Sequence, residues 1–383
     1  MKLDFERYLE AHQQEAFDLL VTLAQIPAPS NQEEQRAQFC LSWLQAQGAA
    51  QAYIDDALNV VVPFGCEDGM PMAVFMAHSD VVFPDTMPLP LRIEDGQIHC
   101  PGIGDDTANV IVILMAAKYL AETGIKPEKL GVLLVVNSGE EGLGNLKGSR
   151  AICKKHGSRI REFVTLDALT DSLVDRAVGS MRYRITVTTE GGHSFNAFGN
   201  PNAIVCLADL IHDLYTVTLP EKGKTTYNVG LISGGTSVNT IAQSAEMLYE
   251  FRSDERESLA YMERFLEDTL KKHRSQGITV DCALIGNRPC GGSVDPVAQA
   301  DLCARAAAAE RVYYGTEPAF HSGSTDCKIP LSMGIPSVCM GCVRGTGAHT
   351  REEAIRIDSL LPGLKAGFAM ILHHFPTPTA AAE

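Results

Sequence analysis

The segment Met72-Ala-Val-Phe-Met-Ala-His-Ser-Asp80 begins as a continuous apolar run and ends in a histidine and an aspartate. Runs of this length are typical of strands that are buried on both faces of a sheet. Residues 130–136 and 163–166 have the same form and lead into Asn137-Ser-Gly-Glu-Glu141 and Asp167, and residues 109–120 between them indicate a helix. Alternating strands and helices predict an α/β sheet covered on both faces. All three runs place a His, Glu or Asp at the carboxyl end of a strand, where such sheets bind ligands.

The first 50 residues are expected to be helical, because apolar residues recur at near-helical spacing from Leu9 to Leu23. The stretch Pro27-Ala-Pro-Ser30 interrupts this pattern. Ser30 together with Glu33 resembles a capping box, which would open a second helix.

The stretch between residues 178 and 289 has a different pattern. Residues 181–188 alternate apolar and polar side chains, as in a half-exposed antiparallel strand, and residues 245–251 indicate another strand. Apolar residues at helical spacing predict helices over residues 203–214 and 259–270. We therefore expect an inserted α+β domain at residues 178–289, within a first domain formed by residues 1–177 and 290–383.

Charge and composition exclude several classes of function. The chain of 383 residues has a formal net charge of −15, and nucleic-acid binding needs a basic face, so no nucleic-acid partner is expected. No stretch is apolar enough for a membrane span, and the N-terminus does not have the pattern of a secretory signal. The 11 cysteines show no disulfide framework, and we interpret the isolated pair Cys339 and Cys342 as core or loop thiols. These features predict a reduced protein of the cytoplasm.

Several short motifs carry candidate chemistry, and each has a simpler alternative. His78-Ser-Asp80 offers an imidazole for a divalent metal, with a carboxylate that can fix its tautomer, although most such triplets are accidental. In Gly102-Ile-Gly-Asp-Asp106 a carboxylate at a tight turn could bridge two cations. The alternative for that motif is a helix cap, a position that aspartate favours.

Two further motifs lie later in the chain. Gly139-Glu-Glu-Gly142 places adjacent acids after a buried strand, which costs free energy unless cations are present; the alternative is a solvated turn. Successive side chains diverge, so one acid can bind metal while the other faces the substrate water. Asp167 lies at the end of the run of residues 163–166, and His349 is a lone late histidine of a kind that is more often structural or exposed than a ligand. The order of the whole set, at strand ends, is much stronger evidence for a metal site than any single motif.

The motifs and their order resemble the M20 family of metallopeptidases over essentially the whole chain. The resemblance implies an α/β/α zinc-peptidase-like catalytic domain with an inserted ferredoxin-like domain that serves as a lid and in homodimerisation. It also implies two Zn²⁺ ions, a set of ligands that would fit Co²⁺ or Mn²⁺ as well. The implied ligands are His78, Asp105, Glu141, Asp167 and His349.

The resemblance also implies a role for each motif. Asp105 would bridge both ions, through a cis peptide to Asp106. Asp167 would complete the first metal site with His78, which Asp80 would orient. Glu141 and His349 would complete the second site, and Glu140 would be the general base.

The inserted domain also matches the family. His193, in Gly191-Gly-His-Ser194, resembles the lid histidine that stabilises the oxyanion, often in the site of a dimer partner. Asn239 resembles a residue of the substrate-lining loop, and Arg252 resembles the arginine that holds a substrate carboxylate. From the residues alone, His193 could equally be a turn residue and Arg252 an exposed strand position.

Ile103 and Thr107 stand where many family members have Arg and Lys, which changes the charge near the substrate without removing a ligand. Asp167 resembles the aminopeptidase and dipeptidase branch, since deacylases and carboxypeptidase G2-like members usually have Glu there. We therefore expect hydrolysis of short peptides, with Glu140 as general base and water activated by two zinc ions. The alternatives are an N-acyl amino-acid deacylase or carboxypeptidase on the same scaffold, a non-catalytic peptide-binding relic, and a structural α/β protein with accidental acids.

Overall fold

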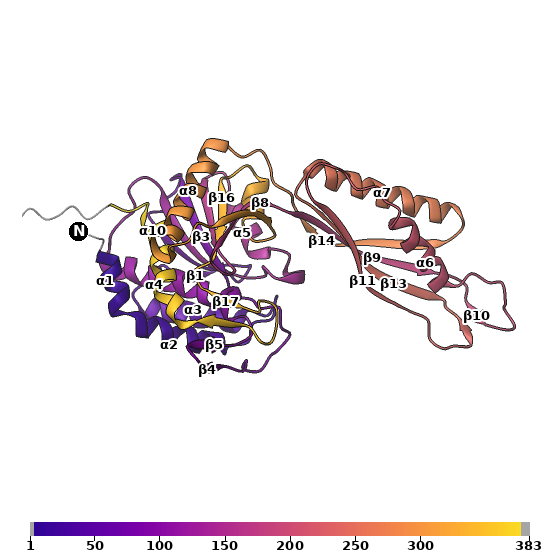
Figure 1. Ribbon diagram of the computed structural model, residues 1–383, viewed down its shortest axis with the longest axis horizontal. Helices are drawn as coiled ribbons and strands as arrows, with labels where there is room; N and C mark the ends of the chain where they lie inside the picture. The colour runs from indigo at the N-terminus through magenta and orange to yellow at the C-terminus, as the bar shows by residue number, and fades with distance from the viewer. Residues whose placement is uncertain (1–3, 377–383) are drawn as a thin grey trace, which may run out of the picture. The chain divides into compact units, whose positions relative to one another are not determined.

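The structure is a computed structural model that describes residues 4–376, apart from the side chain of Leu143. The chain divides into two compact units (Figure 1). One unit is Met1–Ala177 with Gly292–Glu383, and the other is Val178–Gly291.

The first unit is built on an eight-stranded sheet with the order β1-β2-β6-β3-β7-β16-β8-β15. Its central strands β6, β3, β7 and β16 are parallel to one another. The strands are β1 (Tyr53–Ile54), β2 (Val60–Phe64), β3 (Met72–His78), β6 (Gly131–Asn137), β7 (Ile160–Leu166), β8 (Ser172–Ala177), β15 (Ala319–Gly323) and β16 (Ser337–Met340). The three apolar runs of the sequence are β3, β6 and β7, so their carboxyl ends meet at one edge of the sheet.

Alternate residues of the central strands supply two separate hydrophobic cores. On β3, Phe75 faces the larger core, whereas Val74 and Met76 face the smaller one. The helices over the larger core are α1 (Asp4–Ala11), α2 (Gln13–Ala24), α3 (Glu34–Ala46), α4 (Ala108–Thr123), α8 (Pro296–Tyr314) and α10 (Leu360–Leu372). The helices over the smaller core are α5 (Lys147–His156) and α9 (Lys328–Ser332).

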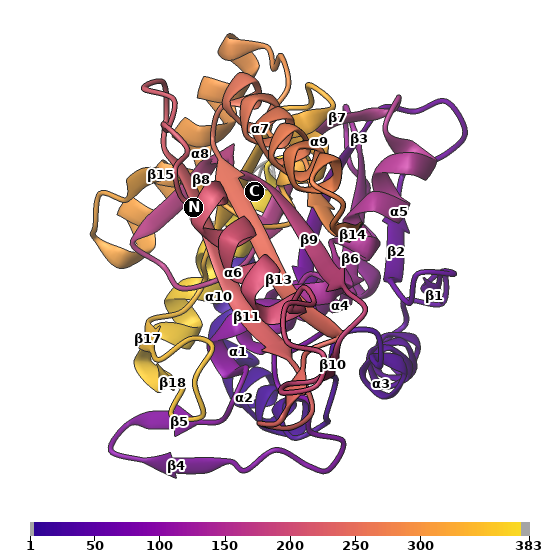
Figure 2. The same cartoon turned by 90° about the vertical axis from the view of Figure 1, so that its right-hand side faces the viewer.

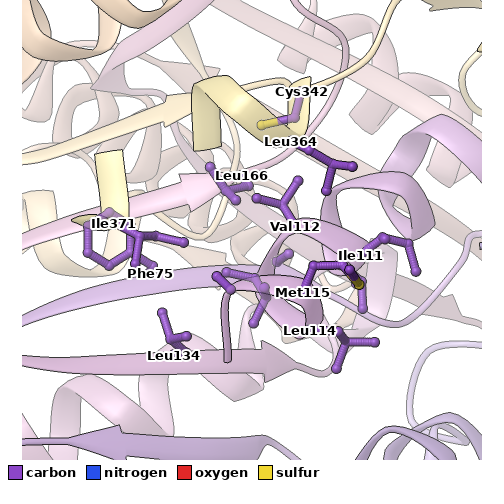
Figure 3. Close-up of a cluster of buried hydrophobic side chains, with 14 of the residues drawn as sticks. Phe75, Ile111, Val112, Leu114, Met115, Leu134, Leu166, Cys342, Leu364 and Ile371 are labelled. Carbon is purple, nitrogen blue, oxygen red and sulfur yellow. The ribbon is translucent and has the colours of Figure 1, made fainter. Parts of the chain in front are cut away.

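Figure 3 shows part of the larger core, where Phe75, Leu134 and Leu166 of the strands lie with Val112 and Met115 of α4. Burial of each such side chain contributes about 1.5–3 kcal/mol. The predicted α/β sheet with both faces covered is confirmed.

A second sheet of the first unit has four short strands in the order β17-β18-β5-β4. They are β4 (Arg92–Glu94), β5 (Gln97–His99), β17 (Gly345–Thr346) and β18 (Ala354–Arg356), and the short helical turns are η1 (Ile103–Thr107), η2 (Gly142–Gly144) and η3 (Ile357–Ser359). β17 and β18 pair antiparallel, and the loop between them, residues 347–353, carries His349.

The second unit has the chain order β9-α6-β11-β13-α7-β14, which is the βαββαβ pattern of a ferredoxin-like fold. The elements are β9 (Gly179–Thr188), α6 (Ala203–Leu214), β11 (Thr225–Gly234), β13 (Ser244–Ser253), α7 (Arg256–Ser275) and β14 (Thr279–Arg288), with a small ladder of β10 (Gly192–His193) and β12 (Thr240–Ile241). The sheet order is β11-β13-β9-β14, all antiparallel (Figure 2). The predicted α+β, ferredoxin-like architecture is therefore confirmed.

The predicted capping box at Ser30 and Glu33 is wrong. α3 begins at Glu34, and Glu33 precedes it without a side-chain capping bond. Asn31 takes a left-handed φ of 70°, and the Ser30 hydroxyl donates instead to Asp80 Oδ2 at 2.8 Å. Glu33 accepts a hydrogen bond from Lys147 Nζ at 2.8 Å. The Ser30 side chain therefore serves a distant contact, and Glu33 divides its two oxygens between the distant Lys147 and the backbone N–H of Asn31 at 2.8 Å.

Two composition-based predictions can be compared with the structure. The cysteines are free thiols, and Cys339 and Cys342 are buried, in agreement with their interpretation as core residues. In the part of the chain that the structure describes, no helix has both the length and the apolarity that crossing a membrane requires.

Candidate metal centre

The predicted metal ligands are placed by the carboxyl edge of the main sheet and by two neighbouring loops. His78 is the last residue of β3, Asp167 directly follows β7, and Glu141 lies four residues beyond the end of β6. Asp105 lies in η1 before α4, and His349 lies in the β17–β18 loop. The structure thus brings all five residues together within the first unit.

Asp105 lies between the two histidines. Its Oδ1 is 3.0 Å from His78 Nε2, and its Oδ2 is 3.0 Å from His349 Nε2. Asp167 Oδ1 lies 3.8 Å from His78 Nε2, and Glu141 Oε1 lies 3.0 Å from His349 Nε2. The Asp105 carboxylate therefore joins two ligand groups, which is what a shared ligand of two cations requires.

The donor set fits divalent cations. The ligand atoms of His78, Asp105 and Glu141 lie within 4.8 Å of one another, and so do those of His78, Asp106 and Asp167. The Asp106 carboxylate already accepts hydrogen bonds from the His78 backbone N–H and the Asn109 amide, so Asp105 is the better ligand of the two. Imidazole and carboxylate groups are the donors that zinc sites use.

The carboxylates hold protons on the two histidines. Hydrogen bonds with Asp105 and Glu141 raise the pKa of His349 to about 11. Burial lowers the pKa of His78, but the carboxylates around it, first Asp106, outweigh burial and raise that pKa overall. Burial, and then repulsion from Asp105, raises the pKa of Asp167 to about 7. Metals bind the deprotonated forms, so a cation entering here would release protons.

Asp80 supports the site through two kinds of contact. His78 Nδ1 lies 3.0 Å from the backbone oxygen of Asp80 and 3.5 Å from its carboxylate, so Nδ1 is a donor, and Nε2 is the nitrogen that would offer its lone pair to a metal once it has released its proton. The Asp80 carboxylate accepts the backbone N–H groups of Glu140 at 3.0 Å and Glu141 at 2.9 Å. Glu140 and Glu141 are 5% and 6% exposed, so this buried loop is held by Asp80.

Glu353 is a buried residue of the candidate site to which the sequence did not point. Its carboxylate accepts the backbone N–H groups of Gly102 at 2.7 Å, Gly104 at 2.8 Å and Asp105 at 2.8 Å. Gly102 has a φ of 75°, and a Cβ there would lie 2.3 Å from Val81. Burial raises the pKa of Glu353 to about 7, and the three N–H groups act in the opposite direction. The loop that carries His349 therefore also holds the turn that presents Asp105.

The Asp105–Asp106 peptide bond is cis, as the family resemblance implied. His349 has a φ of 63°, a left-handed conformation that is uncommon outside glycine and recurs at functional sites. Its side chain is 57% exposed, whereas that of His78 is 1% exposed. A substrate arriving from solvent would therefore meet the side of the site that carries His349.

Two more buried residues connect the site to its surroundings. Arg36 donates to the backbone oxygen of Ser79 at 2.9 Å and to the Thr107 hydroxyl at 3.0 Å. Asn109 donates to the backbone oxygen of Ala168 at 3.0 Å and accepts the N–H of Cys342 at 2.8 Å. These contacts span long sequence separations, and the sequence offered no signal for them.

The predicted substrate residues belong to the second unit. His193 on β10 is exposed, and its Nδ1 accepts the Phe195 N–H at 3.2 Å. The Asn239 side chain accepts the Ser237 hydroxyl at 2.7 Å, and Arg252 on β13 donates to Glu250 at 3.0 Å. Their neighbours Gly192 and Thr240 line a cavity of about 710 Å³ within this unit.

Comparisons with known proteins agree with this geometry. The sequence model described as peptidase family M20/M25/M40 matches residues 74–373. Carboxypeptidase G2 from Pseudomonas sp. (strain RS-16) is 25% identical over 223 residues, 56% of this chain and 52% of that enzyme, so the match spans about half the length of that relative.

Two solved structures share the fold. The aminopeptidase PepT from Bacillus cereus ATCC 10987 is 22% identical, with a TM-score of 0.70 over 94% of this chain and 98% of that one. A tripeptidase from Staphylococcus aureus subsp. aureus Mu50 is 21% identical, with a TM-score of 0.73 over 94% of this chain and 97% of that one. At these identities the likeness establishes the two-domain architecture.

Proposed function

Because the chain belongs to peptidase family M20/M25/M40, we propose that it is a metallopeptidase that hydrolyses an amide bond in short peptides with the help of two zinc ions. The observation that carries this proposal is the position of Asp105, whose two oxygens each lie 3.0 Å from a different histidine. Cobalt or manganese would also suit these ligands.

The ligand set divides into two groups that share Asp105. One ion would be held by His78, Asp105 and Asp167, and the other by Asp105, Glu141 and His349. When bound, the ions supply polarisation of the scissile carbonyl and a lowered pKa for water. Glu140 accepts the proton of the attacking water and passes it to the leaving amine, and its buried loop keeps bulk water away from that transfer.

The second unit supplies the substrate contacts in this proposal. His193 donates a hydrogen bond to the developing oxyanion, which contributes most when the donor is already positioned. Asn239 contacts the substrate backbone, and Arg252 pairs with a substrate carboxylate through its planar guanidinium. These three assignments rest on the family resemblance and on the placement of the residues in the second unit.

Asp167 supports the peptidase over the deacylase assignment, because the family branch that acts on short peptides has Asp at this position. The similarity to carboxypeptidase G2 favours a second candidate, a carboxypeptidase or N-acyl amino-acid deacylase with the same metals and base. Both candidates share the chemistry of Glu140 and differ in the substrate that the second unit accepts.

We also propose that the protein forms a homodimer through the second unit. β11 is the edge strand of that sheet and exposes Leu231 and Ile232, at 50% and 54%. An exposed apolar edge strand readily pairs with another chain. Analytical ultracentrifugation tests this proposal, and a monomer at micromolar concentration would contradict it.

The enzymatic proposal is tested with a panel of dipeptides, tripeptides, N-acetyl amino acids and folate-like conjugates, after zinc or cobalt is added to the purified protein. The peptides are expected to be cleaved, and cleavage of acylated substrates alone would favour the second candidate. Glu140→Gln should lower kcat by about 10²–10⁴-fold, the usual contribution of a general base, with zinc content unchanged. Full activity of this variant would overturn the assignment of Glu140.

A further inference from the structure

Asp326 is a buried carboxyl group for which the proposed mechanism has no use. It lies two residues before α9 and is 2% exposed. Its Oδ2 accepts a hydrogen bond of 2.5 Å from Nδ2 of Asn137, the last residue of β6, which is 0% exposed. The carboxyl group and the amide thus share one hydrogen bond in the interior of the first unit.

The hydrogen bond between Asn137 and Asp326 does not involve the second oxygen of the carboxyl group or the oxygen of the amide. Asp326 Oδ1 and Asn137 Oδ1 are both buried, and neither has a hydrogen-bond partner among the residues that the structure describes. Two acceptors cannot satisfy each other, and a buried acceptor without a donor is unfavourable. A proton on Asp326 Oδ1 would satisfy both atoms, because a carboxylic acid and a primary amide form a ring with two hydrogen bonds. In that ring the amide N–H donates to Oδ2, and the acid O–H donates to the amide oxygen.

We propose that Asp326 is kept as a neutral carboxylic acid in a ring of two hydrogen bonds with Asn137, and that this pair positions the end of β6 beside the metal ligand His78. The consequence of this pair for catalysis rests on the function proposed above. The protonation state and the ring itself concern the folded protein and do not depend on hydrolysis.

The surroundings of Asp326 favour the neutral form. Burial raises the pKa of Asp326, and the negative charge of Asp80 adds to this, whereas the nearby Ser149 hydroxyl, which donates to the Leu146 backbone oxygen at 3.3 Å, the Asn137 amide and the charge of His78 oppose it. The titratable and charged groups that face it or adjoin it are His78 and Asp80 from β3 and its end, Asp167 after β7, Cys153 on α5, and Cys327 and Lys328 beside it.

Asn137 transmits this pairing to the metal site through its backbone. His78 and Asn137 are register partners of the parallel strands β3 and β6. The Asn137 backbone oxygen accepts both the N–H and the hydroxyl of Ser79, each at 2.8 Å. α5 packs tightly behind it, since a Cβ on Gly148 would lie 2.9 Å from the Asn137 Cβ. A shift of Asn137 would therefore move the segment that carries His78.

Three variants test the ring. Asp326→Asn keeps two hydrogen bonds as an amide–amide ring, so its zinc affinity should stay within about threefold of the wild type. Asn137→Asp places two acids face to face, and its zinc affinity should fall about 10–100-fold, the usual loss for a residue that supports a metal ligand. The exchange Asn137→Asp with Asp326→Asn restores an acid and an amide and should recover the affinity. Zinc affinity is measured by competition with a chelator.

Infrared difference spectroscopy reads the proton directly. The spectrum of zinc-loaded wild type minus Asp326→Asn at pH 7 should show the carbonyl stretch of a protonated carboxylic acid. Asp268→Asn, which removes an exposed acid on α7, is the control and should show only a carboxylate change. The proposal is overturned if the wild-type difference shows a carboxylate instead, or if the exchange variant binds zinc as weakly as Asn137→Asp. Absence of peptidase activity would leave both readouts unaffected, so it would count only against the proposed function.

Discussion

Replacing Glu353 with glutamine tests whether a single carboxylate holds the turn that presents Asp105. In Glu353→Gln one oxygen can still accept the N–H groups of Gly104 and Asp105, both bonded to Oε1 at 2.8 Å. The new NH₂ then faces the Gly102 N–H, which Oε2 accepts at 2.7 Å. The unpaired buried donor costs stability, whereas glutamine also removes a negative charge that burial disfavours, so the net loss should be about 1–2 kcal/mol of the free energy of unfolding.

The assay is urea unfolding at about pH 8, where a carboxyl group of pKa about 7 is ionised. Zinc affinity is measured alongside and should fall about 10–100-fold, because Asp105 loses its backbone support. Glu352→Gln is the matched control, since Glu352 is the exposed neighbour and its loss should change stability by less than about 0.5 kcal/mol. If Glu353→Gln behaves like this control in both measurements, the carboxylate does not hold the turn.

Two further predictions concern pH. Burial raises the pKa of Glu162, but hydrogen bonds from His374 and Arg305 outweigh it and lower the pKa from 4.5 to about 2, which contributes about 3 kcal/mol to stability. This stabilisation by ionised Glu162 is present above pH 4.5 and is lost as the pH falls toward 2. The free energy of urea unfolding of Glu162→Gln should therefore lie below that of the wild type near neutral pH and match it only in acid. An equal difference at all pH values would contradict this. Zinc affinity, measured by isothermal titration calorimetry, should rise as the pH is raised from about 6 to about 8, and binding should release protons. The reason is that His349 and Asp167 must lose their protons before they can bind the ion. A zinc affinity that does not change with pH would show that these protons are not displaced.

Much of the candidate metal centre could be predicted because its residues follow apolar strands. His78 ends β3 and Asp167 follows β7, and parallel strands bring their carboxyl ends together whatever the loops do. The alternation of Val74 and Phe75 between two cores likewise follows from the period of a strand. These features depend on local pattern, which a single sequence contains.

The supporting contacts could not be predicted in the same way. Glu353 bonds to Gly102 across 251 residues of sequence, and neither residue belongs to a periodic pattern. The carboxyl group of Asp326 meets Asn137 across 189 residues. Ser30 was misjudged for the same reason, because its local partner in a capping box is replaced by the distant Asp80. A prediction from neighbouring residues fails where a buried carboxylate that is distant in the sequence is the stronger hydrogen-bond acceptor.

The bonds of Ser30 and Arg36 bear on how this protein can be shortened. The family match begins at residue 74, which suggests that the first helices are dispensable. A fragment of residues 74–373 would nevertheless lose the hydroxyl that bonds Asp80 and the guanidinium that bonds Ser79 and Thr107. It would also lose β2, which pairs with β6. Truncation for crystallisation or screening should therefore retain the N-terminal helices, since trimming to the family boundary would weaken a site that contains none of the deleted residues.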